Sequence, residues 1–299
     1  MSIDQPRLFP LDRPVLPASQ WCQRWTGGAH SWRHRSDGGF DAERYSVALL
    51  DESAAKRFVT ANHYSGTYPA ALARWGLWET GHVLVGVAVL AVPVSTTVLT
   101  NVFPGLEPIT EAAELARFVL IDAVPAIGES WFLAQVFTQA ARAGWRGVVS
   151  FSDPVPRHVA GRLVFPGHIG TIYQAANAVY TGRSTPRTLT VLPDGKVLTA
   201  RSAQKVRAGE RGHDHIEARL VALGARPRRG RTPGAVWLTQ ALDQIGATRL
   251  RHSGNHRYAF PIGTTRRARA AVQIAGPTSP YPKRTPRSDD DPQAGRRRR

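Results

Sequence analysis

Runs of apolar residues alternate along the chain with segments of helical spacing, and together they predict most of the secondary structure. Short, mainly apolar runs predict strands at 45–50, 74–80, 82–94, 114–121 and 148–151. The run VLVGVAVLAV within 82–94 is almost wholly apolar, which predicts a strand that is central in a sheet. Apolar residues three and four apart predict helices at 51–65 and 130–144.

The second half of the chain continues this alternation. A helix is predicted at 171–180, where Tyr173, Asn177 and Tyr180 are spaced to share one face. A hairpin is predicted at 188–200, because its centre carries the turn sequence PDG. Further elements are predicted as helices at 215–225 and 236–245 and a closing strand at 254–261.

The order of these elements predicts an α/β fold, in which a mixed central sheet carries helices on both faces. Residues 43–263 contain all of them and are interpreted as one domain. Residues 1–42 show no periodicity and are interpreted as an irregular N-terminal extension packed by its tryptophans. Residues 264–299 are basic and of low complexity, so they predict a disordered tail that binds phosphates or aids solubility.

The net charge is the feature of the composition that says most about a binding partner. The net charge is +17, and the 36 residues of the tail account for +7 of it, so the remaining chain is itself strongly basic. Such a field attracts polyanions, of which nucleic acid is the usual one. No apolar run is long enough to span a membrane and the N-terminus has no signal-peptide core, so we expect no membrane partner. The single cysteine excludes an intrachain disulfide and a multi-thiolate zinc site, and it fits a reduced, intracellular compartment.

Candidate chemistry lies where strands and helices end. Asp153 follows the strand at 148–151, and strand ends are common places for chemistry in α/β sheets. His63 and Tyr64 stand at the end of the helix at 51–65, where His63 is either a C-capping cation or a general base. The loop at 122–130 leads into a helix N-terminus, which suits phosphate binding with help from Gly128 or Ser130.

Other polar residues allow more than one interpretation. The period of two places Glu114 and Arg117 on opposite faces of their strand. Tyr173 either packs in the core or lines a cleft. Among possible metal ligands, His213 and His215 form a pair without a nearby third partner, and the spacing of Cys22, His30 and His34 matches no tight metal site.

The predicted order of elements is similar to that of the GCN5-related N-acetyltransferase (GNAT) fold, in which an acyl-coenzyme A lies where two parallel strands separate. The full pyrophosphate motif of that superfamily, Q/R-x-x-G-x-G/A, is not present at its expected place before the helix at 130–144, where the loop at 122–130 carries one glycine. The resemblance implies acetyl-CoA or a related acyl donor as the small-molecule cofactor.

A set of short motifs resembles the Mom-type phage DNA-modification proteins, a divergent branch of the GNAT superfamily. The motifs are NHYS at 62–65, ELAR at 114–117, GES at 128–130, SDP at 152–154, GHIGTIYQA at 167–175 and GNHRY at 254–258. Each is short, but their order and spacing are specific as a set. They cover the chain from the first predicted strand to the closing one.

Mom-type proteins modify the exocyclic N6 amine of adenine in phage DNA to a carbamoylmethyl-type adduct that blocks host restriction. The resemblance therefore implies a GNAT-like transferase that acts on double-stranded DNA in the cytoplasm of the host cell. It assigns catalytic roles to residues His63, Tyr64, Arg117, Asp153 and Tyr173, and cofactor contacts to Gly128 and Ser130. The resemblance also suggests iron as a possible cofactor, with His63, Tyr64 and Asp153 as its ligands. The sequence itself shows no metal site.

Modification of the adenine N6 amine requires residues of these types. Its N6 amine is a weak nucleophile, so a base such as Asp153 or His63 is expected to take its proton as the new bond forms. An arginine such as Arg117 is expected to neutralise developing charge or hold a phosphate, and tyrosines to stack on an extruded base. Two alternatives stay open, namely an ordinary GNAT that acetylates a protein or small-molecule amine and a non-catalytic DNA-binding protein. The pattern favours no particular oligomeric state.

Overall fold

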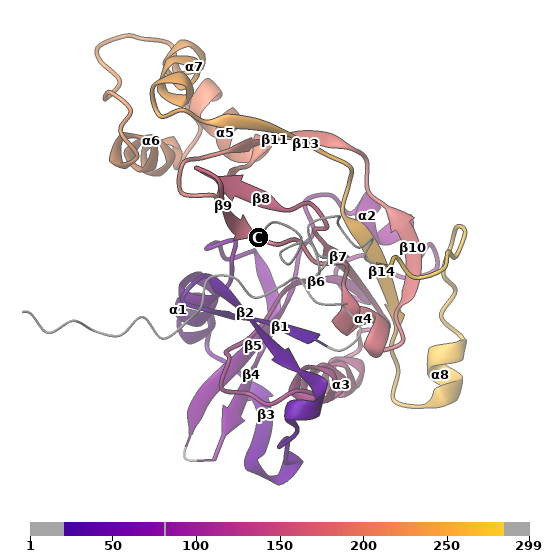
Figure 1. Ribbon diagram of the computed structural model, residues 1–299. Helices are drawn as coiled ribbons and strands as arrows, with labels where there is room; N and C mark the ends of the chain where they lie inside the picture. The colour runs from indigo at the N-terminus through magenta and orange to yellow at the C-terminus, as the bar shows by residue number, and fades with distance from the viewer. Residues whose placement is uncertain (1–20, 81, 284–299) are drawn as a thin grey trace, which may run out of the picture.

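A seven-stranded mixed sheet forms the centre of the molecule in the computed structural model, which describes residues 21–80 and 82–283 (Figure 1). Its strands lie in the order β10-β14-β7-β6-β5-β4-β3, and every neighbouring pair is antiparallel except β6 with β7. The bounds are β3 (Tyr45–Leu49), β4 (Ala71–Glu79), β5 (Val83–Ala91), β6 (Ala112–Leu120), β7 (Gly147–Ser152), β10 (Val179–Arg183) and β14 (His256–Pro261).

The parallel pair separates along its length, and this separation creates the site. Strands β6 and β7 are paired from Ala112 and Gly147 as far as Leu115 and Ser150. Beyond Leu115, β6 continues to Leu120 and is paired only with β5. Strand β7 ends at Ser152, two residues after its last pairing with β6 at Ser150. Side chains at the far ends of both strands therefore face an opening in the sheet.

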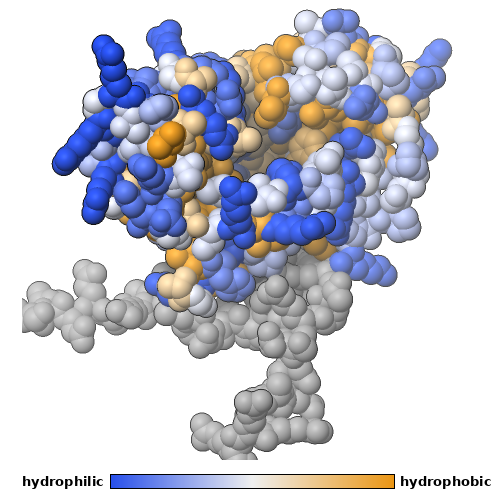
Figure 2. Space-filling view, turned by 90° about the horizontal axis from the view of Figure 1, so that it is seen from above, coloured by the Kyte–Doolittle hydropathy of each residue, from blue (hydrophilic) through white to orange (hydrophobic). Residues whose placement is uncertain are grey.

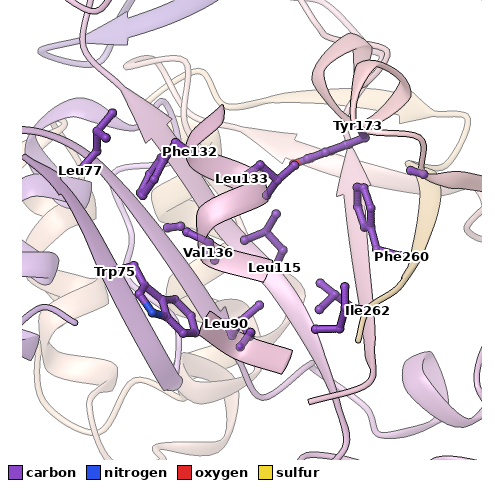
Figure 3. Packing of buried hydrophobic residues seen from close by; sticks show 14 of the residues in the cluster. Trp75, Leu77, Leu90, Leu115, Phe132, Leu133, Val136, Tyr173, Phe260 and Ile262 are labelled. Atoms are coloured by element: carbon purple, nitrogen blue, oxygen red, sulfur yellow. The ribbon is translucent and has the colours of Figure 1, made fainter. Parts of the chain in front are cut away.

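Helices cover both faces of this sheet, because the central strand β5 is apolar on both sides. Helix α3 (Gly128–Arg142) packs Phe132, Leu133 and Val136 against one face, in the cluster shown in Figure 3. Helix α1 (Glu52–Asn62) packs Ala55 and Val59 against the other face. The α/β class and the mixed sheet are confirmed. The shorter helices are α2 (Thr97–Thr100), α4 (Thr171–Ala175) and α8 (Arg266–Ala270), with 3-10 turns η1 (Arg35–Asp37) and η2 (Ala42–Arg44).

A compact insertion lies between the paired strands β10 and β14 and projects from one end of the molecule (Figure 1). Its elements are β11 (Arg187–Val191), β12 (Val197–Leu198), α5 (Ala200–Ala208), α6 (His213–Ala222), α7 (Gly234–Gln244) and β13 (Thr248–His252). The three strands form a separate sheet in the order β12-β11-β13, and the helices bury a core of their own around Leu220 and Trp237. The chain thus carries a second small core within the segment interpreted as one domain.

Two further hairpins lie near the opening of the sheet. The N-terminal hairpin comprises β1 (Trp21–Thr26) and β2 (Ala29–His34), and the second comprises β8 (Arg157–Val159) and β9 (Arg162–Phe165). Arg24 of β1 is fully buried and donates to the carbonyls of Val124 and Pro125, which fixes the hairpin to the loop between β6 and α3.

Three of the differences from the sequence-based expectation concern the course of the chain. Residues 21–34, expected to be irregular, form a hairpin because Gly27 and Gly28 both take positive φ angles at its turn. The helix expected at 171–180 ends at Ala175, since Asn177 adopts a left-handed conformation (φ 59°) and the chain continues as β10, with Tyr180 on that strand.

The third difference concerns the tail. Within the segment expected to be disordered, residues 266–270 form α8, Val272 is buried, and the Tyr281 hydroxyl donates to the carbonyl of Ala178 at 2.7 Å. The end of the tail, 284–299, lies outside the described residues, as do residues 1–20 of the N-terminal extension. Over the described part of the chain, no helix is both long and apolar enough to cross a membrane.

Candidate active site

A cavity of about 810 Å³ opens where β6 and β7 separate, a size within the range of about 300–1,000 Å³ usual for ligand sites. The end of α1, strand β6, the end of β7 and helix α4 contribute its polar wall, and β1 contributes Trp25. Six of the seven residues predicted from the sequence line it, namely His63, Tyr64, Arg117, Ser130, Asp153 and Tyr173. His63 and Tyr173 are 110 residues apart in the chain, so residues distant in the sequence converge on one site.

His63 is a buried, neutral ring at the end of α1. Its Nδ1 accepts a hydrogen bond from the backbone N–H of Ser65 at 3.2 Å and lies 2.9 Å from the Ser65 hydroxyl, so the ring proton is on Nε2. Burial, with help from Arg117 and His168, holds the pKa of His63 well below its usual value. His63 is thus a hydrogen-bond donor at neutral pH, which differs from both the C-capping cation and the general base considered above.

Tyr64 extends this wall as an aromatic surface. Its ring centroid lies 4.1 Å from that of His63, 5.0 Å from Trp25 and 4.6 Å from Phe165. Burial raises the pKa of the Tyr64 hydroxyl, so the phenol stays protonated. These tilted rings form an aromatic wall that can contact a planar ring.

Arg117 is held on β6 by the loop after α1. Its guanidinium donates to the carbonyl of Thr67 at 2.9 Å, to the Thr67 hydroxyl at 2.8 Å and to the carbonyl of Ala116 at 2.6 Å. These acceptors are all neutral, so the positive charge is fixed in place without a carboxylate to neutralise it through these bonds. A fixed cation in a partly desolvated cavity is suited to an anionic group.

Glu114 lies beside Arg117, contrary to the expectation that the two face opposite sides of the strand. The register between β5 and β6 shifts there, with Val89 opposite Arg117 and Leu90 opposite Leu115, so Ala116 is an extra, bulged residue. The bulge brings residues three apart to the same side. Burial raises the pKa of the Glu114 carboxyl to about 7, although Arg117 opposes the shift.

Asp153 has both carboxylate oxygens occupied. Oδ1 accepts from His252 Nε2 at 2.8 Å and from the backbone N–H of Val155 at 3.0 Å, and Oδ2 pairs with the Arg157 guanidinium. Burial alone would raise the pKa of this carboxyl, but the hydrogen bond from His252 and the charge of Arg157 outweigh it and lower the pKa. An ionised carboxylate with its lone pairs engaged is a poor proton acceptor, so this geometry favours a positioning role.

His168 and Tyr173 complete the polar wall opposite Tyr64. The His168 ring lies between the two tyrosines, 6.4 Å from Tyr64 and 6.5 Å from Tyr173 by ring centroids. Tyr173 packs on Tyr258 at 5.3 Å, and burial raises the pKa of its hydroxyl. Tyr173 therefore packs in the core and also lines the cavity, so both roles considered from the sequence apply to it.

Three residues that line or support the site, Glu114, His168 and His252, have no role assigned from the sequence. Glu114 carried a signal, since it is a carboxylate in an otherwise apolar strand, and His168 carried a weaker one as a histidine in a glycine-rich loop. His252 carried none, because it lies 99 residues from Asp153 in the chain and reaches it only through the insertion.

The α3 N-terminus is the place where the sequence resemblance predicts contacts to an acyl donor. No side chain caps it, and Glu129 and Ser130 of its first turn line the cavity. Uncapped amides at a helix N-terminus, with a rotatable hydroxyl beside them, fit an anionic group. Gly128 does not line the cavity; it packs so closely on Val124 that an added Cβ would lie 2.5 Å from that side chain.

A metal site receives no support from the geometry. Within residues 21–80 and 82–283, no three His, Cys, Asp or Glu side chains are grouped so that they could hold an ion. Of the ligands considered for iron, Asp153 is committed to Arg157 and His252, and Tyr64 is held protonated.

The buried histidines predict a pH dependence of stability. Burial lowers the pKa of His168 and of His256 to about 4, from an ordinary value near 6.5. Between these pH values the unfolded chain binds more protons than the folded one, so stability falls as pH is lowered from about 6.5 to about 4. We expect His168→Gln to reduce the difference between urea midpoints measured at pH 7 and pH 5. The exposed control His215→Gln should leave that difference at its wild-type value, and an unchanged difference in His168→Gln would contradict the assignment.

The fold and the site together define a GNAT-like protein, in which a cavity lies between separating parallel strands. The Mom protein family matches residues 44–283, more than three quarters of the chain, and the chain belongs to that family. No curated protein matches it. Two solved structures are similar over part of their length. The spermidine/spermine N-acetyltransferase SpeG from Vibrio cholerae is 11% identical (40% of this chain, 87% of that chain, TM-score 0.23). A tandem GNAT protein from the clavulanic acid biosynthesis pathway is 10% identical (74% and 75%, TM-score 0.32).

Proposed function

We propose that this chain is a transferase that modifies the exocyclic N6 amine of adenine in double-stranded DNA, giving a carbamoylmethyl-type adduct that protects phage DNA from restriction. The observation that carries the proposal is the convergence of His63, Tyr64, Arg117, Asp153 and Tyr173 on one cavity. Membership of the Mom protein family supports the same class of reaction. The strong positive charge of the chain supports a polyanionic substrate.

The cavity walls suit a base that has left the duplex. Extruding a base costs about a few kcal/mol, which contacts in the receiving pocket have to offset. Trp25, Tyr64 and Tyr173 all line the cavity, so their rings can contact a base that enters it. Arg117 and the exposed Arg183 at the cavity wall offer positive charge to the flanking phosphates.

Glu114 is the group best suited to accept the N6 proton. As the N6 lone pair forms a bond to the carbon of the donor, the donor's leaving group departs with its electron pair and the amine proton passes to the Glu114 carboxylate. A carboxyl with a pKa of about 7 is ionised in a large fraction of molecules at neutral pH and still holds a proton well once it has taken one. Transfer from the carbonyl carbon of an acyl donor would give an amide at N6, so a carbamoylmethyl product requires a bound donor whose electrophilic carbon is the methylene group next to its carbonyl.

Arg117 and His63 face the same cavity as fixed donors. The Arg117 guanidinium and the protonated Nε2 of His63 are placed to stabilise negative charge that develops on the donor as the bond forms. Asp153 does not take part in proton transfer in this scheme. It holds Arg157 and His252 and so fixes the end of β7 at the cavity.

The proposal predicts a new nucleoside. When the protein is expressed with a plasmid and the DNA is digested to nucleosides, we expect mass spectrometry to show a deoxyadenosine peak of increased mass. Arg117→Ala should lose the peak, whereas Arg142→Ala, which removes an exposed charge at the far end of α3, should keep it. Unmodified nucleosides from cells with folded protein would contradict the proposal, and acetylation of a protein or small-molecule amine would favour the alternative.

A further inference from the structure

The insertion between β10 and β14 carries a large share of the charge of the chain. Residues 187–252 contain thirteen Lys or Arg and five Asp or Glu, so this segment holds +8 of the total of +17. Three of its carboxylates are engaged by arginines of the same segment, Asp194 with Arg219 at 3.0 Å, Glu210 with Arg201 at 2.6 Å and Glu217 with Arg228 at 2.9 Å. The surplus of positive charge is therefore carried by the remaining Lys and Arg side chains, most of which are exposed.

The edge strand β13 presents part of this surplus on one face. Arg249 and Arg251 are exposed and alternate with Leu250 and His252, so the two arginines point to the same side. Their partners across the ladder are Thr190 and Thr188 of β11. This face, made of Thr188, Thr190, Arg249 and Arg251, is called the arginine-threonine face below.

The strand that carries the arginine-threonine face also reaches the candidate active site. His252, the residue after Arg251, is fully buried and donates through Nε2 to Asp153 Oδ1 at 2.8 Å. Because side chains alternate along a strand, the arginine-threonine face is the exposed face of β13, and the opposite face of the same strand holds the active-site carboxylate. Figure 2 looks down on this end of the molecule and shows hydrophilic side chains on both sides of a hollowed, more apolar strip.

The insertion is also packed against the body on its other side. An added Cβ at Gly195, in the turn between β11 and β12, would lie 2.6 Å from Val164 of β9. An added Cβ at Gly66, just after α1, would lie 3.1 Å from Nζ of Lys196. These close approaches fix the position of the arginine-threonine face relative to the cavity.

The composition of the insertion distinguishes between kinds of nucleic acid. Proteins that bind single strands stack bases on exposed aromatic side chains, whereas duplex binding draws on contacts from cations and hydroxyls to phosphates. The only Phe, Tyr or Trp in residues 187–252 is Trp237, which is 4% exposed and packs in the core of the insertion. Its exposed surface thus offers phosphate contacts and no aromatic stacking platform.

From these observations we infer that residues 187–252 form a duplex-DNA-binding module whose arginine-threonine face contacts the phosphates beside the base that enters the cavity. The position of that base rests on the proposed function, while the binding of duplex DNA does not. The contacts are to the backbone, so the module contributes affinity and orientation with little sequence preference.

The test is the salt dependence of binding to a fluorescein-labelled 20-base-pair duplex, measured by fluorescence anisotropy. Arg249→Ala with Arg251→Ala should weaken binding about tenfold or more near 0.1 M salt, and should reduce the slope of log K against log salt by about 1.8, which is two phosphate contacts. The control pair Lys56→Ala with Arg142→Ala removes the same charge from exposed positions on α1 and α3 and should leave the slope within about 0.5 of wild type.

Each possible result of this binding experiment either supports or overturns the proposed duplex-DNA-binding module. A wild-type slope in the Arg249/Arg251 variant would overturn it, as would equal losses in the two variants or tighter binding of a 20-nucleotide single strand than of the duplex. Because binding needs no chemistry, the result is independent of nucleoside analysis. Unmodified DNA together with a reduced slope would reject the proposed function and leave the module standing.

Discussion

Glu114→Gln is expected to lower the rate of adenine modification by about 10²- to 10⁴-fold, the usual contribution of a general base. Glutamine keeps the size of the side chain and removes its capacity to accept a proton. Since burial raises the pKa of the Glu114 carboxyl to about 7, the wild-type rate should rise with pH through about 7 and level off above it. The rate is measured by nucleoside mass spectrometry with purified protein between pH 5.5 and 8.5.

The matched control for this experiment is Glu43→Gln, which changes an exposed carboxylate in η2 and should keep both the rate and its pH dependence. A residual rate in Glu114→Gln that no longer depends on pH near 7 would fit the proposed role. A wild-type rate in this variant, or a rate that still rises through pH 7, would show that another group accepts the proton.

Asp153→Ala is expected to lower the free energy of unfolding by about 3–5 kcal/mol, because it leaves the Arg157 guanidinium buried without its partner. Adding Arg157→Met should recover most of this loss, since the second substitution removes the unpaired charge. Urea denaturation at pH 7 measures both values.

The control for this prediction is Asp243→Ala, an exposed position on α7 that should change stability by no more than about 0.5 kcal/mol. A cost below about 1 kcal/mol for Asp153→Ala would contradict the buried ion pair. The stability measurement tests this ion pair without any substrate.

The order of the central elements could be predicted from local patterns, because each strand and helix of the sheet carries its own apolar period. The run 82–94 is apolar throughout and does lie in the middle of the sheet as β5. The placing of His63, Arg117 and Asp153 around one opening followed from the family resemblance and from strand ends. The structure brings these three to one cavity.

Features set by tertiary pairing could not be predicted in this way. The bulge at Ala116 depends on the register with β5, so a strict period of two placed Glu114 on the wrong side of Arg117. The chain after α4 has helical spacing, yet Asn177 takes a left-handed conformation and the chain then pairs with β14 as β10, a partner that local spacing does not reveal. The partner of Asp153 is supplied by β13, a strand that local composition did not mark.

The central claim is that an extruded adenine enters the cavity between β6 and β7. A crystal structure of Glu114→Gln bound to a short adenine-containing duplex tests it most directly. We expect one adenine turned out of the helix, with its ring inside the cavity and its N6 amine toward residue 114. A duplex bound with every base stacked, or bound on a face away from Arg117 and His63, would contradict it.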